Sequence, residues 1–137
     1  MYFNMKSWSA KLNQGHEPRL KILEKKFAGM PRGSKMFIAT PKMIQKYVNA
    51  IPLGKLIDVK KMREDLAYQN NADFTCPLTT GIFLRIVAEE SYERFTNDGK
   101  RELMTPFWRI INPTSSLAKK LICGVEFLNE HLALERS

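Results

Sequence analysis

The side chains that most often perform covalent or metal chemistry are scarce in this chain of 137 residues, which has two cysteines and two histidines. Cys76 and Cys123 lie too far from any paired histidines for a metal site, so we expect no metal ligands. Cys76 precedes Pro77 and a predicted helix, where a thiol can have a lowered pKa. The alternative for both cysteines, and for His16 and His131, is a packing role. Because no Ser-His-Asp order or second nucleophile accompanies them, the sequence predicts no catalytic residue and no enzyme activity.

A second set of residues has the types that bind nucleic acid. A predicted helix starts with Thr79, Thr80 and Gly81. Small residues at this place let a sugar-phosphate chain approach, and the amides and the threonine hydroxyls can donate hydrogen bonds to it. Phe107 and Trp108 are adjacent aromatic residues, and such rings can stack on unstacked bases. The alternative for both rings is burial in the core, in which case the indole N–H of Trp108 needs a polar partner.

Two capped helices are predicted ahead of these residues. Thr40 followed by Pro41 is typical of a helix start, because threonine accepts a bond from a free amide and proline has no amide to satisfy. The apolar stripe of this helix is Ile44, Tyr47, Val48 and Ile51. Asp58 is the expected cap of the second helix. That helix turns Val59, Met62 and Leu66 inward and leaves Lys60, Lys61 and Arg63 outward.

The remaining elements complete a mainly α fold with a small β wing. A third helix is predicted from Thr79 to Glu90, and a final amphipathic helix from Val125 to Leu134. Phe107 to Ile111, closed by Asn112-Pro113, has the aromatic and β-branched content of a wing-like strand. Two short helices followed by such a strand are typical of a winged helix-turn-helix domain.

Basic and acidic residues are unevenly distributed along the chain. The net charge is +8, and residues 1–35 hold eight Lys or Arg against two Glu. Glycines and prolines interrupt this segment, and only Arg19 to Phe27 has helical character, so we interpret residues 1–35 as a basic N-terminal arm and residues 36–137 as the domain. Between residues 40 and 63, six Lys or Arg oppose one Asp, which predicts a face that attracts phosphate. Between residues 64 and 98, seven acids oppose two Arg, which predicts a face that repels it.

Three segments, in order and spacing, resemble the alkylguanine-DNA alkyltransferase family over residues 36–135. Thr105-Pro106-Phe107-Trp108-Arg109-Ile110 is similar to the family's Ile-Pro-Cys-His-Arg-Val signature. Ile51-Pro52-Leu53-Gly54-Lys55 is similar to its Ile-Pro-X-Gly-Lys stretch, and Gly124-Val125-Glu126 to the start of its closing helix. The family's DNA-recognition helix corresponds to the segment from Thr79 to Leu84.

The resemblance also implies which functions are absent. Phe107 stands at the position of the alkyl-accepting cysteine and Trp108 at that of the relay histidine, so neither chemical step remains. Glu135 falls where the glutamate that orients the relay histidine would be. Val59 replaces the tyrosine that helps to rotate the target nucleotide, and Leu78 falls near the position of the arginine that fills the vacated space in the duplex.

The resemblance therefore predicts a cytoplasmic, non-catalytic protein without a cofactor, similar to alkyltransferase-like proteins, which bind alkylated DNA without repairing it. Its partners would be double-stranded DNA, including alkylated DNA, and a repair protein, but no membrane. The expected DNA contacts are Lys60, Lys61, Arg63, Thr79, Thr80, Gly81 and Arg85. The expected base pocket is formed by Val59, Phe107, Trp108 and Arg109. The alternative is a protein-interaction module on the same scaffold that has lost nucleic acid binding.

Overall fold

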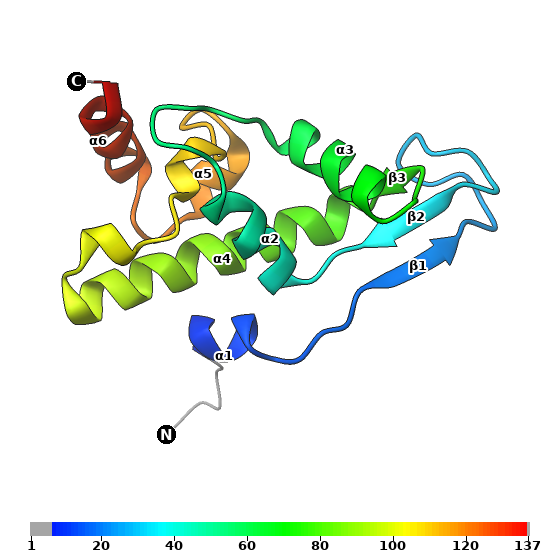
Figure 1. Ribbon diagram of the computed structural model, residues 1–137, viewed down its shortest axis with the longest axis horizontal. Coiled ribbons are helices and arrows are strands. Elements are labelled where there is room, and N and C mark those ends of the chain that lie inside the picture. The colour runs from blue at the N-terminus through cyan, green and yellow to red at the C-terminus, as the bar shows by residue number, and fades with distance from the viewer. Residues whose placement is uncertain (1–6, 137) are drawn as a thin grey trace.

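The structure, a computed structural model, describes residues 7–136 and is mainly helical with a small three-stranded sheet, as the sequence predicts (Figure 1). The helices of the described chain are α1 (Trp8–Leu12), α2 (Pro41–Asn49), α3 (Val59–Gln69), α4 (Pro77–Asp98), α5 (Ser116–Lys120) and α6 (Val125–Arg136). The strands are β1 (Arg19–Ile22), β2 (Lys35–Ile38) and β3 (Phe74–Thr75). Two short 3-10 turns, η1 (Arg101–Leu103) and η2 (Phe107–Arg109), lie between α4 and α5.

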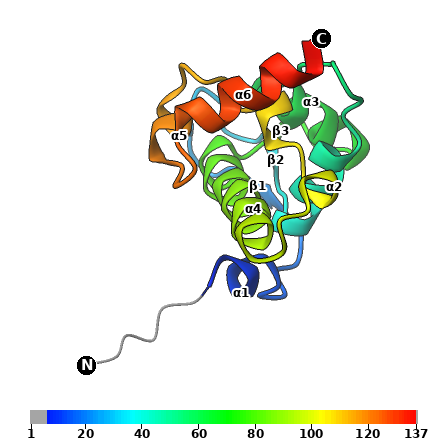
Figure 2. The ribbon, with the colours of Figure 1, turned by 90° about the vertical axis from the view of Figure 1, so that its left-hand side faces the viewer.

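The long helix α4 forms the centre of the molecule, with α1, α2, α5 and α6 arranged around it (Figure 2). Leu84, Val87 and Ser91, on its inner face, are fully buried. The helix begins at Pro77, which needs no amide partner, and ends before Gly99, whose φ of 69° is the left-handed conformation that glycine adopts without strain.

The predicted end of this helix at Glu90 was wrong, since α4 continues to Asp98. Two acids that were expected on the surface near that end are held inside the fold instead. Glu89 and Glu90 are 1% and 7% exposed. Glu90 accepts a bond of 2.9 Å from Arg94 one turn later, and Glu89 accepts bonds from the amide of Ile122. These two carboxylates therefore do not contribute to the predicted phosphate-repelling face.

The predicted starts of α2 and α3 are confirmed. The Thr40 hydroxyl accepts a bond of 3.1 Å from the amide of Met43, and the Asp58 carboxylate accepts one of 2.7 Å from the amide of Lys61. Each cap satisfies an amide that the first helical turn leaves without a backbone partner. The inward stripes of these two helices join α4 in one hydrophobic cluster.

The sheet corrects the reading of residues 19–27, which have no helix. β1 pairs antiparallel with β2, so that Arg19 lies opposite Ile38, and β2 pairs parallel with β3. Arg-Leu-Lys-Ile alternates with period two, which suits a strand better than a helix. β2 begins at Lys35, so the predicted boundary between arm and domain falls inside a strand that pairs with both parts.

The predicted wing at Phe107 to Ile111 was also wrong. Phe107–Arg109 forms the 3-10 turn η2, in which the amide of Arg109 donates to the carbonyl of Pro106. The Phe107 side chain is completely buried, so the segment turns into the core instead of extending along a sheet edge. The last predicted helix is present as α6, with Leu128 inward.

Candidate functional site

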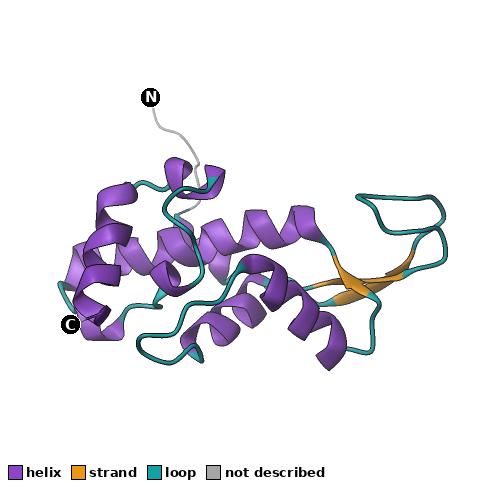
Figure 3. Cartoon of the chain, turned by 90° about the horizontal axis from the view of Figure 1, so that it is seen from above, coloured by secondary structure: helices purple, strands orange, loops and turns teal. Residues whose placement is uncertain are grey.

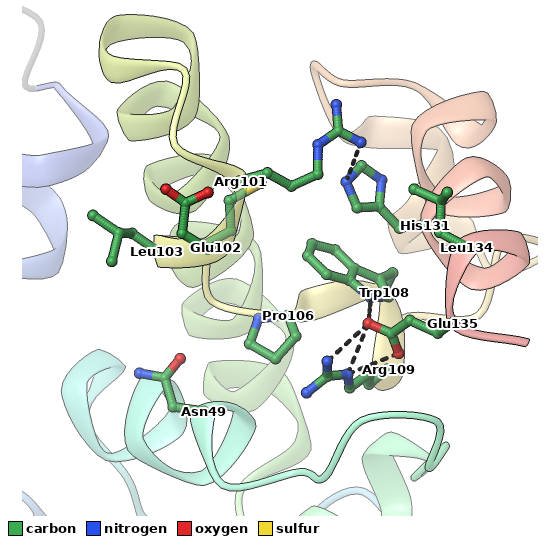
Figure 4. A pocket seen from close by; sticks show the side chains of 11 residues that line it. Asn49, Arg101, Glu102, Leu103, Pro106, Trp108, Arg109, His131, Leu134 and Glu135 are labelled. Carbon is green, nitrogen blue, oxygen red and sulfur yellow. Dashed lines mark hydrogen bonds and ion pairs between the residues drawn. The ribbon is translucent and has the colours of Figure 1, made fainter. Parts of the chain in front are cut away.

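The residue pair Trp108–Arg109 converges with Glu135 in a buried polar cluster, which we call the Trp108 cluster (Figure 4). The indole Nε1–H of Trp108 donates to Oε2 of Glu135 at 2.7 Å. The Arg109 guanidinium donates to the same carboxylate through Nε at 2.9 Å and through Nη2 at 2.8 Å. Paired bonds of this kind are stronger than neutral ones and fix the orientation of both groups.

The cluster joins three parts of the chain that are distant in sequence. Trp108 and Arg109 come from η2, and Glu135 comes from the last turns of α6. Arg109 also donates through Nη1 to the carbonyl of Ile51 at 2.7 Å, in the loop after α2. Arg109 thus holds the backbone of this loop through a carbonyl, in addition to its ion pair with Glu135.

The electrostatics favour an ionised Glu135. Burial by itself would raise its pKa, but hydrogen bonds from Arg109 and Trp108, together with one from the amide of Gly54, lower the pKa below the ordinary value. The carboxylate therefore remains an acceptor and has no proton to donate near neutral pH. It serves as a structural anchor in this cluster.

Both aromatic rings of the motif are covered. Phe107 stacks on Phe127 of α6, with ring centroids 6.0 Å apart and planes 10° from parallel. The Trp108 ring lies against His131, with centroids 4.3 Å apart, and Trp108 is 5% exposed. Neither ring offers a free face to a base. This corrects the predicted base pocket, in which both rings would have stacked on a rotated nucleotide.

His131 is the principal site residue that the sequence analysis did not select. It is 2% exposed, its Nδ1 lies 2.8 Å from the carbonyl of Phe127, and its Nε2 lies 3.1 Å from Nη1 of Arg101. These contacts fit the tautomer in which Nδ1 donates to the carbonyl and Nε2 accepts from the guanidinium. Burial, with a smaller contribution from the charge of Arg101, lowers the pKa of His131, so the ring is neutral at pH 7.

A hollow of about 730 Å³ opens beside this cluster. Asn49 lies on one side of it and Arg101 on the other, with the edge of Trp108 and His131 between them (Figure 4). The hollow has an amide, a guanidinium and an aromatic edge, which suits hydrogen bonding to a polar ligand. Among the described residues, its lining includes the exposed carboxylate Glu102 but no Ser, Thr, Cys or Lys.

The other two residues of the predicted base pocket are Val59 and Arg109. Val59 lies away from this hollow, and the polar atoms of Arg109 already have partners. Val59 is half-buried at the start of α3 and packs against the main core. Arg109 does line the hollow, but its guanidinium is committed to Glu135 and Ile51. Of the four predicted pocket residues, only Trp108 and Arg109 are brought together at an open surface.

The start of α4 faces a second hollow of about 730 Å³, between α1 and α5. Gly81 lines it with the exposed side chains of Leu78 and Ile82, and Lys11 and Lys120 also line it. We call this surface the α4 hollow. Its mixture of apolar and basic lining residues suits a partner that carries both apolar and negatively charged groups.

Three predicted DNA contacts on α4 are already occupied or enclosed. Thr80 is 1% exposed and donates its hydroxyl to the carbonyl of Cys76 at 2.6 Å. The Thr79 hydroxyl is buried and has no hydrogen-bond partner among the described residues. Arg85 donates to the carbonyl of Lys120 at 3.2 Å and pairs with Glu89 at 3.4 Å. Gly81 is therefore the predicted α4 contact that remains open.

The three cations predicted on α3 differ in availability. Lys60 is exposed, whereas Lys61 pairs with Asp65 one turn later at 2.9 Å. Arg63 is half-buried, and its Nε is enclosed without a hydrogen-bond partner among the described residues. Of these three cations, Lys60 is therefore the one that is exposed and has no ion pair among the described residues.

The cysteines have no arrangement for chemistry in the described chain. Cys76 is 4% exposed and packs with Leu23, Met30 and Met36. Burial, with the charge of Glu89, raises the pKa of Cys123 to about 11, so its thiol stays protonated and weakly nucleophilic at neutral pH. The structure brings no group of three His, Cys, Asp or Glu together for a metal within residues 7–136. No helix in the same range has the length and apolar content of a bilayer span.

Comparisons with protein-family models, with curated proteins and with solved structures found no match to this chain. The resemblance to alkyltransferases therefore remains an interpretation of the sequence segments alone.

One feature of the sequence points to His131, which the prediction did not select as a site residue. His131 and Glu135 are four apart on α6, a spacing that places two side chains on the same helix face. Arg101 has no comparable signal, because its contact with His131 spans thirty residues and depends on the turn η1 after α4.

Proposed function

We propose that this chain is a cytoplasmic, non-catalytic DNA-binding protein of the alkyltransferase-like kind, in which α3 and α4 act as a helix-turn-helix pair. Duplex DNA, including alkylated DNA, approaches the start of α4 and is handed to a repair protein without chemical change. Phe107 supports the non-catalytic part of the proposal, because a phenyl ring cannot accept an alkyl group by displacement.

The observation that carries the proposal is Gly81. It lies within α4, where glycine costs about 0.5–1 kcal/mol relative to alanine. A Cβ built at Gly81 would meet no atom within 4 Å, and its φ is not in the left-handed region. Neither packing nor backbone conformation within the described chain requires a glycine here. A sugar-phosphate chain that approaches the helix closely provides a physical reason for it.

The geometry of Glu135 gives separate support. The resemblance predicts that Glu135 contacts the residue in the histidine position, and Trp108, at that position, donates to Glu135 across 27 residues of sequence. Local periodicity would not predict a contact over this separation. The agreement favours a shared scaffold, in which an indole N–H takes the hydrogen-bonding role of the imidazole N–H.

The alternative is a protein-interaction module, and the apolar part of the α4 hollow favours it. Leu78 and Ile82, which line that hollow, are 62% and 52% exposed. Exposed apolar side chains at one site are typical of protein-binding surfaces. This alternative predicts that the wild-type chain does not bind duplex DNA at any salt concentration.

The test is Gly81→Ala, measured by chemical unfolding and by fluorescence anisotropy with a labelled duplex. We expect the free energy of unfolding to rise by about 0.5–1 kcal/mol, because alanine is the better helix former. We expect affinity for DNA to fall about tenfold, which corresponds to about 1.4 kcal/mol, because the new methyl group obstructs the approach.

The matched control is Asn129→Ala on the exposed face of α6, which raises helix propensity away from the α4 hollow. It should increase stability by a few tenths of a kcal/mol, roughly, and leave DNA affinity unchanged. A Gly81→Ala protein that is more stable and binds DNA as tightly as the wild type would contradict DNA contact at α4.

A further inference from the structure

The strands β1 and β2 form an antiparallel ribbon that extends from the helical body at one end of the molecule (Figure 3). All four residues of β1 are exposed, including Leu20 and Ile22, which are 51% and 53% exposed. β1 is an edge strand, because the strand order is β1-β2-β3. A strand with both faces and one edge in solvent contributes little burial to the fold.

The connection between the two strands is nevertheless ordered by its own contacts. Leu23 and Met30 from this loop pack with Met36 of β2 and with Cys76 in a second hydrophobic cluster. Phe27 and Met30 form a backbone bridge, and the amide of Gly33 donates to the carbonyl of Leu23 at 2.8 Å. The ribbon and its loop are therefore a built structure that can present side chains in fixed positions.

This structure carries a dense positive charge. Its six cations are all exposed: Arg19, Lys21, Lys25, Lys26, Arg32 and Lys35. The same range, residues 19–35, contains one acid, Glu24. No ion pair neutralises any of these cations among the described residues, whereas elsewhere Lys61, Arg85, Arg94 and Arg109 are paired with carboxylates.

Protection of an edge strand against aggregation explains only part of this charge. Lysines on an exposed edge do prevent pairing with another chain, and Lys21 on β1 has that position. Lys25, Lys26 and Arg32 lie in the loop beyond the strands, where there is no edge to protect. Their concentration on an ordered projection indicates a surface for a polyanion.

We propose that the β1–β2 ribbon and its loop, residues 19–38, form an arm whose cations between residues 19 and 35 bind the phosphate backbone of duplex DNA beside the site at α4. This inference rests on the proposed function and adds a second contact surface to it. The continuity of the chain supports it: β2 pairs with β3, and α4 begins two residues after β3 ends. A duplex that touches the start of α4 therefore has the ribbon within reach along its backbone.

The experiment measures DNA affinity against salt for the wild type and for the double variant Lys25→Gln/Lys26→Gln. Each phosphate contact contributes about 0.9 to the slope of log affinity against log salt, so the slope should decrease by about two. The control removes the same charge elsewhere, with Lys100→Gln/Arg136→Gln, two exposed residues near the far ends of α4 and α6. The control should keep the wild-type slope, and all three proteins should have the same melting temperature.

The outcomes separate the ribbon from the proposed function. A wild type that binds DNA, with an unchanged slope in the ribbon variant, would overturn the ribbon proposal and leave the proposed function standing. A wild type that does not bind DNA would overturn both. If vesicles of anionic phospholipid bind the wild type more tightly than DNA does, and the ribbon variant loses that binding, the partner is a membrane surface and the proposal is wrong.

Discussion

The Trp108 cluster and the β1–β2 ribbon hold their charges in opposite surroundings. In the Trp108 cluster, the charges of Arg109 and Glu135 are nearly buried and paired, with side chains 14% and 10% exposed. In the ribbon, six cations are exposed and have no ion pair among the described residues. The paired charges of the first region stabilise the fold, whereas the unpaired cations of the second remain free to attract a negatively charged partner.

This difference changes the place where binding is expected. The sequence directs attention to Phe107 and Trp108, but the structure covers both rings and pairs the polar atoms beside them. The free charge lies on the ribbon and the open helix surface lies at Gly81. Variants in the Trp108 cluster should therefore affect folding first, and variants at the ribbon should affect binding first.

The largest expected effect is that of Trp108→Ala. Removal of a large buried aromatic side chain leaves a cavity and should lower the free energy of unfolding by about 3–5 kcal/mol. Urea unfolding measures this loss, and Trp108→Phe is the matched variant, because it keeps most of the ring and loses the hydrogen bond to Glu135. A loss below about 1 kcal/mol for Trp108→Ala would show that the ring is not part of the core.

Arg109→Ala should have the next largest effect, about 3 kcal/mol, because it leaves the Glu135 carboxylate buried without its ionic partner. The control is Arg136→Ala, which removes an exposed arginine next to Glu135 in sequence and should change the free energy of unfolding by less than about 0.5 kcal/mol. Equal effects of the two variants in an unfolding titration would mean that the ion pair contributes nothing beyond a surface pair.

Whether an element could be predicted from the sequence depends on how far apart in the chain its stabilising contacts lie. The starts of α2 and α3 depend on Thr40, Pro41 and Asp58, which act within one helical turn, and they were predicted correctly. The turn η2 was predicted as a strand because Phe107 and Trp108 favour strands locally, whereas their contacts with Phe127 and His131 of α6 decide the conformation. Such contacts have no signal within the segment itself.

The ribbon shows the opposite situation, in which a local signal existed and was outweighed. Arg19 to Ile22 alternates cation and apolar residue, which is the period of a strand, and the following glycines and proline suit a loop. Burial of Glu89 had no local signal, because it depends on the amide of Ile122, which is distant in sequence. The Glu90–Arg94 pair, by contrast, has the spacing of one helical turn and could have been read from the sequence.

A smaller effect is expected from pH, through His131. Its folded-state pKa is lowered by burial, so between that pKa and the unfolded value of about 6.5 the unfolded chain binds a proton that the native chain does not. The contribution to stability is complete above about pH 6.5 and decreases as the pH falls towards the folded pKa. Protonation at Nε2 also removes the acceptor for Arg101.

The measurement is the free energy of unfolding between about pH 7.5 and about pH 5.5, roughly one unit on either side of the unfolded pKa. His131→Gln is the control, since it lacks the titrating group. The pH dependence of the wild type should exceed that of the variant over this range. Parallel curves would contradict a neutral, buried His131.

The central claim is that the chain binds duplex DNA without acting on it, and one anisotropy titration tests it directly. The wild type is titrated against a plain duplex and against the same duplex with one alkylated guanine, over a series of salt concentrations, and the protein is recovered for mass measurement. We predict binding that weakens linearly in log affinity against log salt, and an unchanged protein mass because Phe107 cannot accept the alkyl group. No binding to either duplex, or a protein that gains the alkyl group, would contradict the account.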